Sequence, residues 1–268
     1  MASRSHPLHV AEVGQGRPLV LVHGWATSGR ALLGLAEAVG GRARVLLPDL
    51  RGHGRSPPPA GPFSLEDHGA DVASLVSDLG LERPVLAGWS MGAEVALAAA
   101  CRLQAQGIPV GGLALLAATA RFTSAEGYPH GLSAREVEGL SARLSLHPEK
   151  ALSRFFAACF AKGELPPEER KRAEGTLAAE PPHLAAAQGA LRALAEGDFR
   201  AAAGAIAAPA LLLHGEQDAI VPEGASRFLS RALRQARRVT LPGAGHAPFL
   251  TRAEACASSL RAFLGELS

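Results

Sequence analysis

A serine in a setting that suits a nucleophile lies in the first half of the chain. Ser90 is the centre of a Gly-Trp-Ser-Met-Gly sequence at 88–92, directly after the apolar run 84–87 and before a helix-compatible stretch at 93–103. The Gly-x-Ser-x-Gly pattern between a strand and a helix is typical of a sharp turn that exposes the serine hydroxyl. Glycine suits such a turn because the chain reverses within a few residues and the serine backbone is strained. The pattern predicts that Ser90 is a nucleophile if a histidine and a carboxylate lie nearby.

Both partners follow Ser90 in the chain, each after an apolar run that predicts a strand. Asp218 follows the run 209–213, and His246 follows the run 238–241. Loops after the strands of an open α/β sheet are where such sheets build their sites, and the order serine, acid, histidine is that of an α/β hydrolase. Asp218 could instead be a turn former. Asp198 follows no predicted strand, so we interpret it as a helix cap or an ion-pair partner and assign Asp218 as the acid.

Acyl transfer also needs N–H donors for the oxyanion that forms on the substrate. We expect one from the backbone of Met91, the residue after the nucleophile, and one from Trp25, in a His-Gly-Trp sequence after an apolar run. His23 precedes the serine in the chain, so we interpret it as a residue that fixes this loop by hydrogen bonding. The two tryptophans of the chain, Trp25 and Trp89, either wall an apolar acyl slot or pack in the core.

Apolar runs alternate with helix-compatible stretches along the rest of the chain. Predicted strands cover 8–13, 18–22, 44–47, 85–87, 113–117, 210–213 and 238–241, and predicted helices cover 31–39, 65–79, 93–103, 224–232 and 253–264. This alternation predicts an α/β fold with a mostly parallel central sheet and helices on both faces. The polar, glycine-rich loop 49–56 is interpreted as a structural brace, because it lacks the spacing of a dinucleotide site.

The segment 121–203 shows no convincing strand. Helix-compatible stretches at 134–144, 148–161 and 166–179 alternate there with proline and glycine. Roughly eighty residues are too many for a structureless connection in a compact domain. We therefore expect a helical cap, or lid, at 121–203 over the sheet edge that carries Ser90, with 1–120 and 204–268 as the core. The alternative is that these helices only cover the surface.

Composition excludes several other classes of protein. The net charge is +2, with 27 basic and 25 acidic side chains, which gives no reason to expect nucleic acid. The three cysteines are far apart and lack metal-type spacing, which favours a reducing compartment. The polar N-terminal sixteen residues lack the apolar centre of a signal peptide, and no apolar run is long enough for a membrane span. We expect a cytoplasmic monomer without cofactor or metal.

Taken together, these motifs resemble the α/β-hydrolase superfamily over nearly the whole chain. Within it, the chain is most similar to the esterases that hydrolyse the methyl ester of pimeloyl-acyl-carrier protein in biotin synthesis. This finer resemblance rests on Trp89 and Met91 around the serine, Trp25 after His-Gly, and His-Ala-Pro-Phe at 246–249. It implies a serine carboxylesterase that frees a carboxylate and methanol through an acyl-enzyme.

The resemblance also extends to the cap segment. In that family the matching stretch lines the acyl channel, which implies the same for Leu140, Ser141, Ala142, Arg143 and Leu144. Two basic residues with i, i+4 spacing bind the acidic carrier protein there, and they match Lys150 and Arg154. The family often has an aromatic residue at the position of Leu140 and arginine at that of Lys150. Because 121–200 holds eleven basic and eleven acidic side chains, a carrier-protein patch has to be local; otherwise these two residues form a solvated face.

The triad does not select one substrate, because this fold hosts many chemistries. A carboxylesterase for short-chain small-molecule esters, a C–C bond hydrolase and a cofactor-free haloperoxidase would use the same three residues. A non-catalytic ligand receptor is a further alternative, which an intact triad disfavours.

Overall fold

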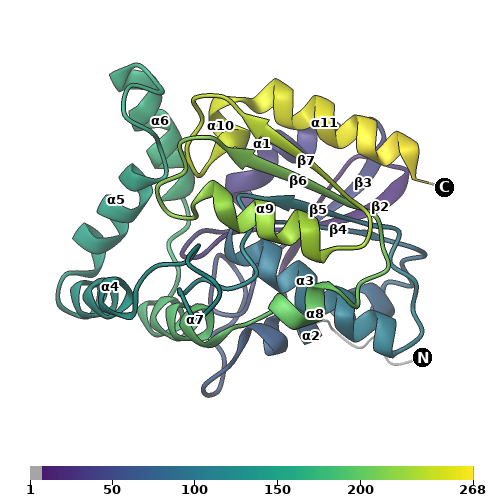
Figure 1. Ribbon diagram of the computed structural model, residues 1–268, viewed down its shortest axis with the longest axis horizontal. Helices are drawn as coiled ribbons and strands as arrows, with labels where there is room; N and C mark the ends of the chain where they lie inside the picture. Colours follow the sequence, from purple (N-terminus) through teal and green to yellow (C-terminus); the bar gives the residue numbers. More distant parts are fainter. Residues whose placement is uncertain (1–7, 268) are drawn as a thin grey trace.

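A seven-stranded sheet forms the centre of the computed structural model, which describes residues 8–267 (Figure 1). Its strands are β1 (Val10–Val13), β2 (Arg17–Val22), β3 (Ala43–Pro48), β4 (Val85–Trp89), β5 (Gly112–Leu116), β6 (Ala210–Gly215) and β7 (Ala236–Leu241). They lie in the order β1-β3-β2-β4-β5-β6-β7. Only the pairing of β1 with β3 is antiparallel, so the predicted mostly parallel α/β sheet is confirmed.

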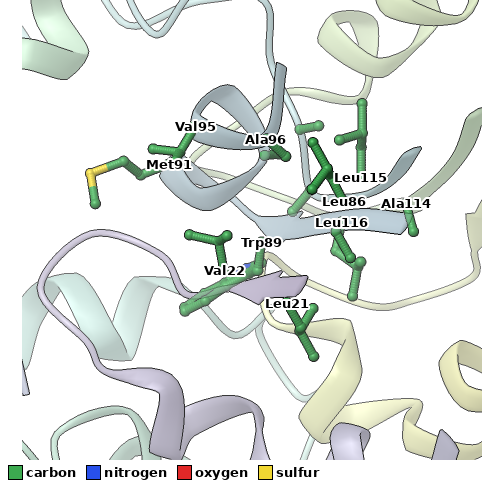
Figure 2. Packing of buried hydrophobic residues seen from close by; sticks show 14 of the residues in the cluster. Leu21, Val22, Leu86, Trp89, Met91, Val95, Ala96, Ala114, Leu115 and Leu116 are labelled. Carbon is green, nitrogen blue, oxygen red and sulfur yellow. The ribbon is translucent and has the colours of Figure 1, made fainter. Parts of the chain in front are cut away.

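The middle strands are buried on both faces, which explains their continuous apolar sequences. Every residue of β4 and β5 is buried, and Leu86 of β4 lies opposite Leu113 of β5 in the parallel register. Figure 2 shows how the side chains of these two strands pack together with those of α3 (Met91–Ala105) behind the serine turn, the labelled examples being Leu86, Leu115, Leu116, Val95 and Ala96. The core thus holds both β4 and the helix that follows it.

Helices cover both faces of the sheet (Figure 1). On one face lie α1 (Leu33–Val39), which follows the short 3-10 helix η1 (Gly29–Leu32), and α11 (Ala253–Glu266), joined to α10 (Pro248–Thr251). On the other face lie α2 (Leu65–Asp78), α3, α8 (Arg200–Ala203) and α9 (Glu223–Ala232). Ser64 caps α2 in a box with Asp67, in which each side chain accepts from the other residue's backbone N–H, so the helix start is encoded locally.

Four longer helices lie between β5 and β6 in the chain, beside the end of the sheet where β7 leads into α10 (Figure 1). They are α4 (Ala134–Leu146), α5 (Pro148–Ala158), α6 (Pro167–Leu177) and α7 (Leu184–Glu196). Within this insertion the structure has two isolated β-bridges and no strand. The alanine-rich α7 has no counterpart among the predicted helices, although alanine is the strongest helix former.

Apart from α7, the differences between the predicted strands and those of the structure lie at strand ends. Residues 8 and 9 were predicted to begin the first strand, but β1 starts at Val10. His9 instead makes loop contacts: its N–H donates to Ser56 Oγ, and its carbonyl accepts from Asp49 N–H. Predictions for residues 1–7, including part of the expectation about a signal peptide, lie outside the described residues. No helix in the described part of the chain is long and apolar enough to span a membrane.

Candidate active site

The turn that carries Ser90 is fixed by close backbone packing. Ser90 has φ +55°, a conformation that residues with side chains rarely adopt, and its N–H donates to Leu116 O at 2.9 Å. A Cβ on Gly88 would lie 2.0 Å from Gly92 O, and a Cβ on Gly92 would lie 2.2 Å from Val22 O. Both positions therefore require glycine, because any larger side chain would clash with neighbouring backbone. This steric requirement explains the two glycines of the Gly-x-Ser-x-Gly pattern.

The three side chains predicted to act together do meet. His246 Nε2 lies 2.8 Å from Ser90 Oγ, and His246 Nδ1 lies 2.7 Å from Asp218 Oδ2. A carboxylate oxygen can only accept, so Nδ1 carries the proton and Nε2 is free to accept from the serine hydroxyl. The side chains of His246 and Asp218 are fully buried, whereas Ser90 retains 8% exposure. The arrangement can activate the hydroxyl for attack on a carbonyl.

Asp218 is held for this contact by its own loop. Its Oδ1 accepts from the N–H groups of Ile220 and Val221, both at 2.9 Å, which leaves Oδ2 to His246. His214, at the end of β6, lies 3.5 Å from Oδ2 and hydrogen-bonds to Val221 O at 2.8 Å. Burial lowers the pKa of His214, although the nearby Asp218 opposes this shift. A neutral His214 thus packs beside the carboxylate without neutralising its charge.

The two expected oxyanion donors come from neighbouring segments. Met91 is the first residue of α3, where N–H groups have no partner within the helix. Trp25 belongs to the turn after β2, and a Cβ on Gly24 would touch the Trp89 ring at 2.8 Å, so this turn packs directly against the serine turn. Both donors are thus near the nucleophile, and their role in binding an oxyanion remains a prediction.

His23 holds the turn before Trp25, as its position in the chain suggested. Its Nε2 accepts from Leu50 N–H at 2.9 Å, and its Nδ1 lies 2.8 Å from Gly24 O. Burial lowers the pKa of His23 to about 4, so the ring is neutral at physiological pH and can accept with one nitrogen while it donates with the other. The loop at 49–56 is a brace: Asp49 accepts from the N–H groups of Gly29 and Arg55.

The tryptophans are buried and hydrogen-bonded. Trp89 Nε1 donates to His246 O at 2.7 Å. Its ring packs edge-on against that of Phe249, with 4.9 Å between the ring centroids. Trp25 Nε1 donates to Ala187 O of α7 at 2.8 Å, and its ring meets Phe155 of α5 edge-on at 4.7 Å. Both side chains therefore pack as structural links, and Trp25 connects the turn after β2 to the inserted helices.

A cavity of about 580 Å³ lies between the inserted helices and the Asp218 loop. Its lining combines apolar side chains, among them Leu140, Phe155 and Ile220, with the charged side chains of Arg135, Glu136, Arg143 and Arg154. Phe155 lines the cavity and also touches Trp25. Ala219 and Ile220, which directly follow Asp218, also line the cavity, whereas Ser90, Asp218 and His246 do not. The cavity therefore borders the loop that carries Asp218 and is large enough to hold a chain of methylene groups.

Only part of the cap stretch singled out by the family resemblance lines this cavity. Leu140 and Arg143 do so, whereas Ser141 lies on another side of α4 and lines a separate groove toward α7. Leu144 is fully buried in the core, and Ala142 is exposed. The division follows from helical geometry, because consecutive residues of a helix point in different directions. Of the two basic residues of α5, Arg154 lines the cavity, while Lys150 is exposed and does not.

Two other residues near the site were not singled out from the sequence. His214 could have been noticed, because a His-Gly pair follows a predicted strand there. Glu164 accepts from Gly245 N–H at 2.9 Å, next to His246, but lies in a connection whose sequence carries no motif. Asp198, by contrast, fulfils its prediction: it pairs with Arg121 and accepts from Arg200 N–H at the start of α8. In the described residues no three His, Cys, Asp or Glu side chains are placed to share a metal ion.

Comparison with known proteins agrees with this geometry. Residues 17–253 match the family described as the alpha/beta hydrolase fold. The chain is 37% identical to a pimeloyl-[acyl-carrier protein] methyl ester esterase of Chromobacterium violaceum, over 91% of this chain and 92% of that one. It is 31% identical to the protein of that name from Xanthomonas oryzae pv. oryzae, over 97% of this chain and 100% of that one. Among solved structures, a thermophilic esterase from Thermogutta terrifontis superposes with a TM-score of 0.82 at 27% identity, over 97% of this chain and 93% of that one. The chain therefore belongs to the α/β-hydrolase family.

Proposed function

We propose that this protein is a serine carboxylesterase that hydrolyses the methyl ester of a pimeloyl group carried on acyl carrier protein. The observation that carries the proposal is the hydrogen-bonded series Ser90, His246 and Asp218, with a partly apolar cavity that borders the loop after Asp218. The curated relatives from Chromobacterium and Xanthomonas, both over 30% identical across nearly the whole chain, are named for this activity. Their agreement supports this substrate over the other esters that the same triad could hydrolyse.

In the proposed reaction, Ser90 Oγ attacks the ester carbonyl while its proton passes to His246 Nε2. Asp218 holds the imidazolium in place, and the N–H groups of Met91 and Trp25 bind the oxyanion. His246 then gives the proton to the leaving methoxide, which departs as methanol and leaves an acyl-enzyme. A water molecule deprotonated by His246 attacks the acyl group, and the free carboxylate is released as Ser90 regains its proton.

The inserted helices supply the acyl site in this proposal, so that 121–203 acts as a cap. The cavity beside Ile220 and Phe155 would take the methylene chain, whose burial is favourable at about 0.8 kcal/mol per methylene. The guanidinium groups of Arg135, Arg143 and Arg154, which outnumber the one acidic lining residue, Glu136, would meet the acidic carrier protein, and the exposed Lys150 on α5 would add a fourth positive charge. Leu140 then contacts the acyl chain.

The decisive experiment compares Ser90→Ala with wild type, with the exposed Ser153→Ala of α5 as the matched control. Methanol release from pimeloyl-acyl-carrier-protein methyl ester should fall on the order of 10⁴-fold or more in the first variant only. A fluorophosphonate probe should label wild type and Ser153→Ala but not Ser90→Ala. An unlabelled wild type would instead favour a ligand receptor.

The substrate is tested by comparing the carrier-borne ester with a series of small methyl esters. The double variant Lys150→Glu and Arg154→Glu should lower kcat/KM for the carrier-borne ester by roughly tenfold or more, because like charges then face the acidic partner. It should affect small esters much less, and the exposed Arg102→Glu of α3 should change neither. Equal efficiency with short small esters would favour a short-chain carboxylesterase.

A further inference from the structure

The loop that carries His246 is bound by the inserted helices. Three consecutive N–H groups of this loop face the connection between α5 and α6. Gly245 N–H donates to Glu164 Oε1 at 2.9 Å, and Cys159 O accepts from His246 N–H at 2.8 Å and from Ala247 N–H at 3.3 Å. The backbone of the catalytic histidine therefore takes its acceptors from a segment more than eighty positions away in the chain.

Glu164 links the two segments with a single carboxylate. While Oε1 accepts from Gly245 N–H, Oε2 accepts from Ala161 N–H at 2.7 Å, within its own connection. Both bonds have a charged acceptor, which makes them stronger than bonds between neutral groups. The contact is also close, since a Cβ on Gly245 would lie 2.6 Å from Cys159 O. The segment 159–164, which we call the clamp, therefore packs closely against the loop that carries His246.

The same helix that leads into the clamp also lines the acyl cavity. Phe155 and Arg154 of α5 face the cavity, and Cys159 is the residue that ends this helix. Arg170 of α6 donates to Ala157 O at 2.6 Å, which secures the last turn of α5. A displacement of α5 by a ligand would therefore reach the loop of His246 through Cys159 O and Glu164. On the other side of the loop, the Trp89 indole N–H at the end of β4 donates a hydrogen bond to the carbonyl oxygen of His246.

We propose that Glu164 is a positioning residue for His246: its carboxylate couples the cap helix that lines the acyl cavity to the loop of the catalytic histidine, through the N–H of Gly245. The proposal rests on the proposed esterase function for its kinetic consequences, while the contact itself can be measured without catalysis. It predicts that the bound acyl chain, through α5, helps to set the imidazole between Ser90 and Asp218.

The kinetic test compares Glu164→Ala and Glu164→Gln with the exposed Glu168→Ala of α6 as the matched control. Active sites are titrated with a fluorophosphonate, so that kcat refers to folded, reactive enzyme only. We expect kcat per titrated site to fall about ten- to a hundredfold in Glu164→Ala, because small misplacements of a catalytic group have effects of this size. KM should stay nearly constant. Glu164→Gln, which keeps one acceptor oxygen, should restore part of the loss.

The coupling between Glu164 and the acyl site is tested by the dependence of kcat on acyl chain length. In wild type, kcat for methyl esters should rise with acyl chain length as the cavity fills, and in Glu164→Ala this rise should be lost. Gly245→Ala places a methyl group against Cys159 O and should reproduce the phenotype with Glu164 intact. A kcat per titrated site within twofold of wild type in Glu164→Ala, with the chain-length dependence preserved, would overturn the proposal.

Hydrogen–deuterium exchange of the peptide that covers 243–249 provides the readout that does not need activity. Glu164→Ala should raise the exchange rate of this peptide by roughly tenfold, because local opening becomes easier when the loop loses a bond. Glu168→Ala should not change it. Unchanged exchange in Glu164→Ala would contradict the clamp even in an active enzyme. Faster exchange in Glu164→Ala, together with a wild type that hydrolyses no ester, would uphold the contact and reject the esterase function.

Discussion

The carboxyl group of Glu94 is buried behind the serine turn without a partner. It lies in the first turn of α3, is fully buried, and neither of its oxygens has a hydrogen-bond partner within residues 8–267. Burial raises its pKa well above the usual value near 4.5, and the negative charges of Asp198 and Glu66 add to the shift. Tyr128 is also close, since Glu94 contributes to the raised pKa of that phenol. We predict that Glu94 is protonated in the folded protein at neutral pH.

The position of Glu94 at a helix N-terminus does not reverse this conclusion. Interaction of a carboxylate with the helix dipole is worth about 0.3–1 kcal/mol. Removing an unpaired charge from water costs several kcal/mol. The second effect is larger, so the folded state keeps the proton that the unfolded state loses above about pH 4.5.

This difference makes stability fall with rising pH. Above the unfolded pKa and below the folded pKa, folding binds one extra proton at Glu94, so its contribution to the free energy of unfolding decreases by about 1.4 kcal/mol per pH unit. Glu94→Gln removes this contribution and replaces it with a cost that does not depend on pH. Between pH 5.5 and 7.5, the stability of the variant relative to wild type should therefore rise with pH, by as much as about 3 kcal/mol if Glu94 stays protonated throughout.

The assay is urea denaturation at several pH values, followed by tryptophan fluorescence, for wild type, Glu94→Gln and the exposed Glu37→Gln of α1. Titration of other groups cancels in the difference between variant and wild type. Glu37→Gln should give a difference that stays constant over this pH range. Parallel stability profiles for wild type and Glu94→Gln would refute the reasoning, because they would mean that the buried carboxyl titrates alike in both states.

Two further predictions concern the site itself. Asp218→Asn should lower kcat about 10⁴-fold, because an amide at this position favours the wrong tautomer of His246; active-site-titrated kinetics that retain a tenth of the wild-type rate would contradict the triad assignment. Gly88→Ala should lower the free energy of unfolding by about 3 kcal/mol or more, since its Cβ would meet Gly92 O at 2.0 Å. Gly34→Ala, where the new Cβ meets nothing within 4 Å on α1, should be neutral or stabilise by about 0.5–1 kcal/mol in the same denaturation experiment.

Local sequence was sufficient to predict most of the fold. Strands such as β4 and β5 are continuous apolar runs because both of their faces are buried, and the helices between them follow from periodicity and end signals. The prediction was less accurate at element ends, as at Leu8 and His9, where loop hydrogen bonds compete with strand pairing. The helix α7 went unnamed although its sequence carries a signal for it, because the buried residues Ala187, Leu191 and Leu194 recur at helical spacing.

The sequence by itself determined which side chains could do the chemistry. Glycines at 88 and 92 leave a strained serine as the residue that can be exposed, and an acid and a histidine follow later strands in the expected order. Parallel strands bring the loops after them to one edge of the sheet, which made a meeting of the three residues possible. The structure shows that Ser90, Asp218 and His246 do meet.

Only the tertiary structure decided how the histidine is held. Its own N–H donates to Cys159 O, its carbonyl accepts from the Trp89 indole, and the N–H of the preceding Gly245 donates to Glu164, all from segments that are distant in the chain. It also decided that Leu140 and Arg143 face the cavity while Ser141 faces a separate groove. These contacts leave no local pattern because a backbone carbonyl is common to every residue, and the side of a helix that meets a neighbour depends on where that neighbour packs.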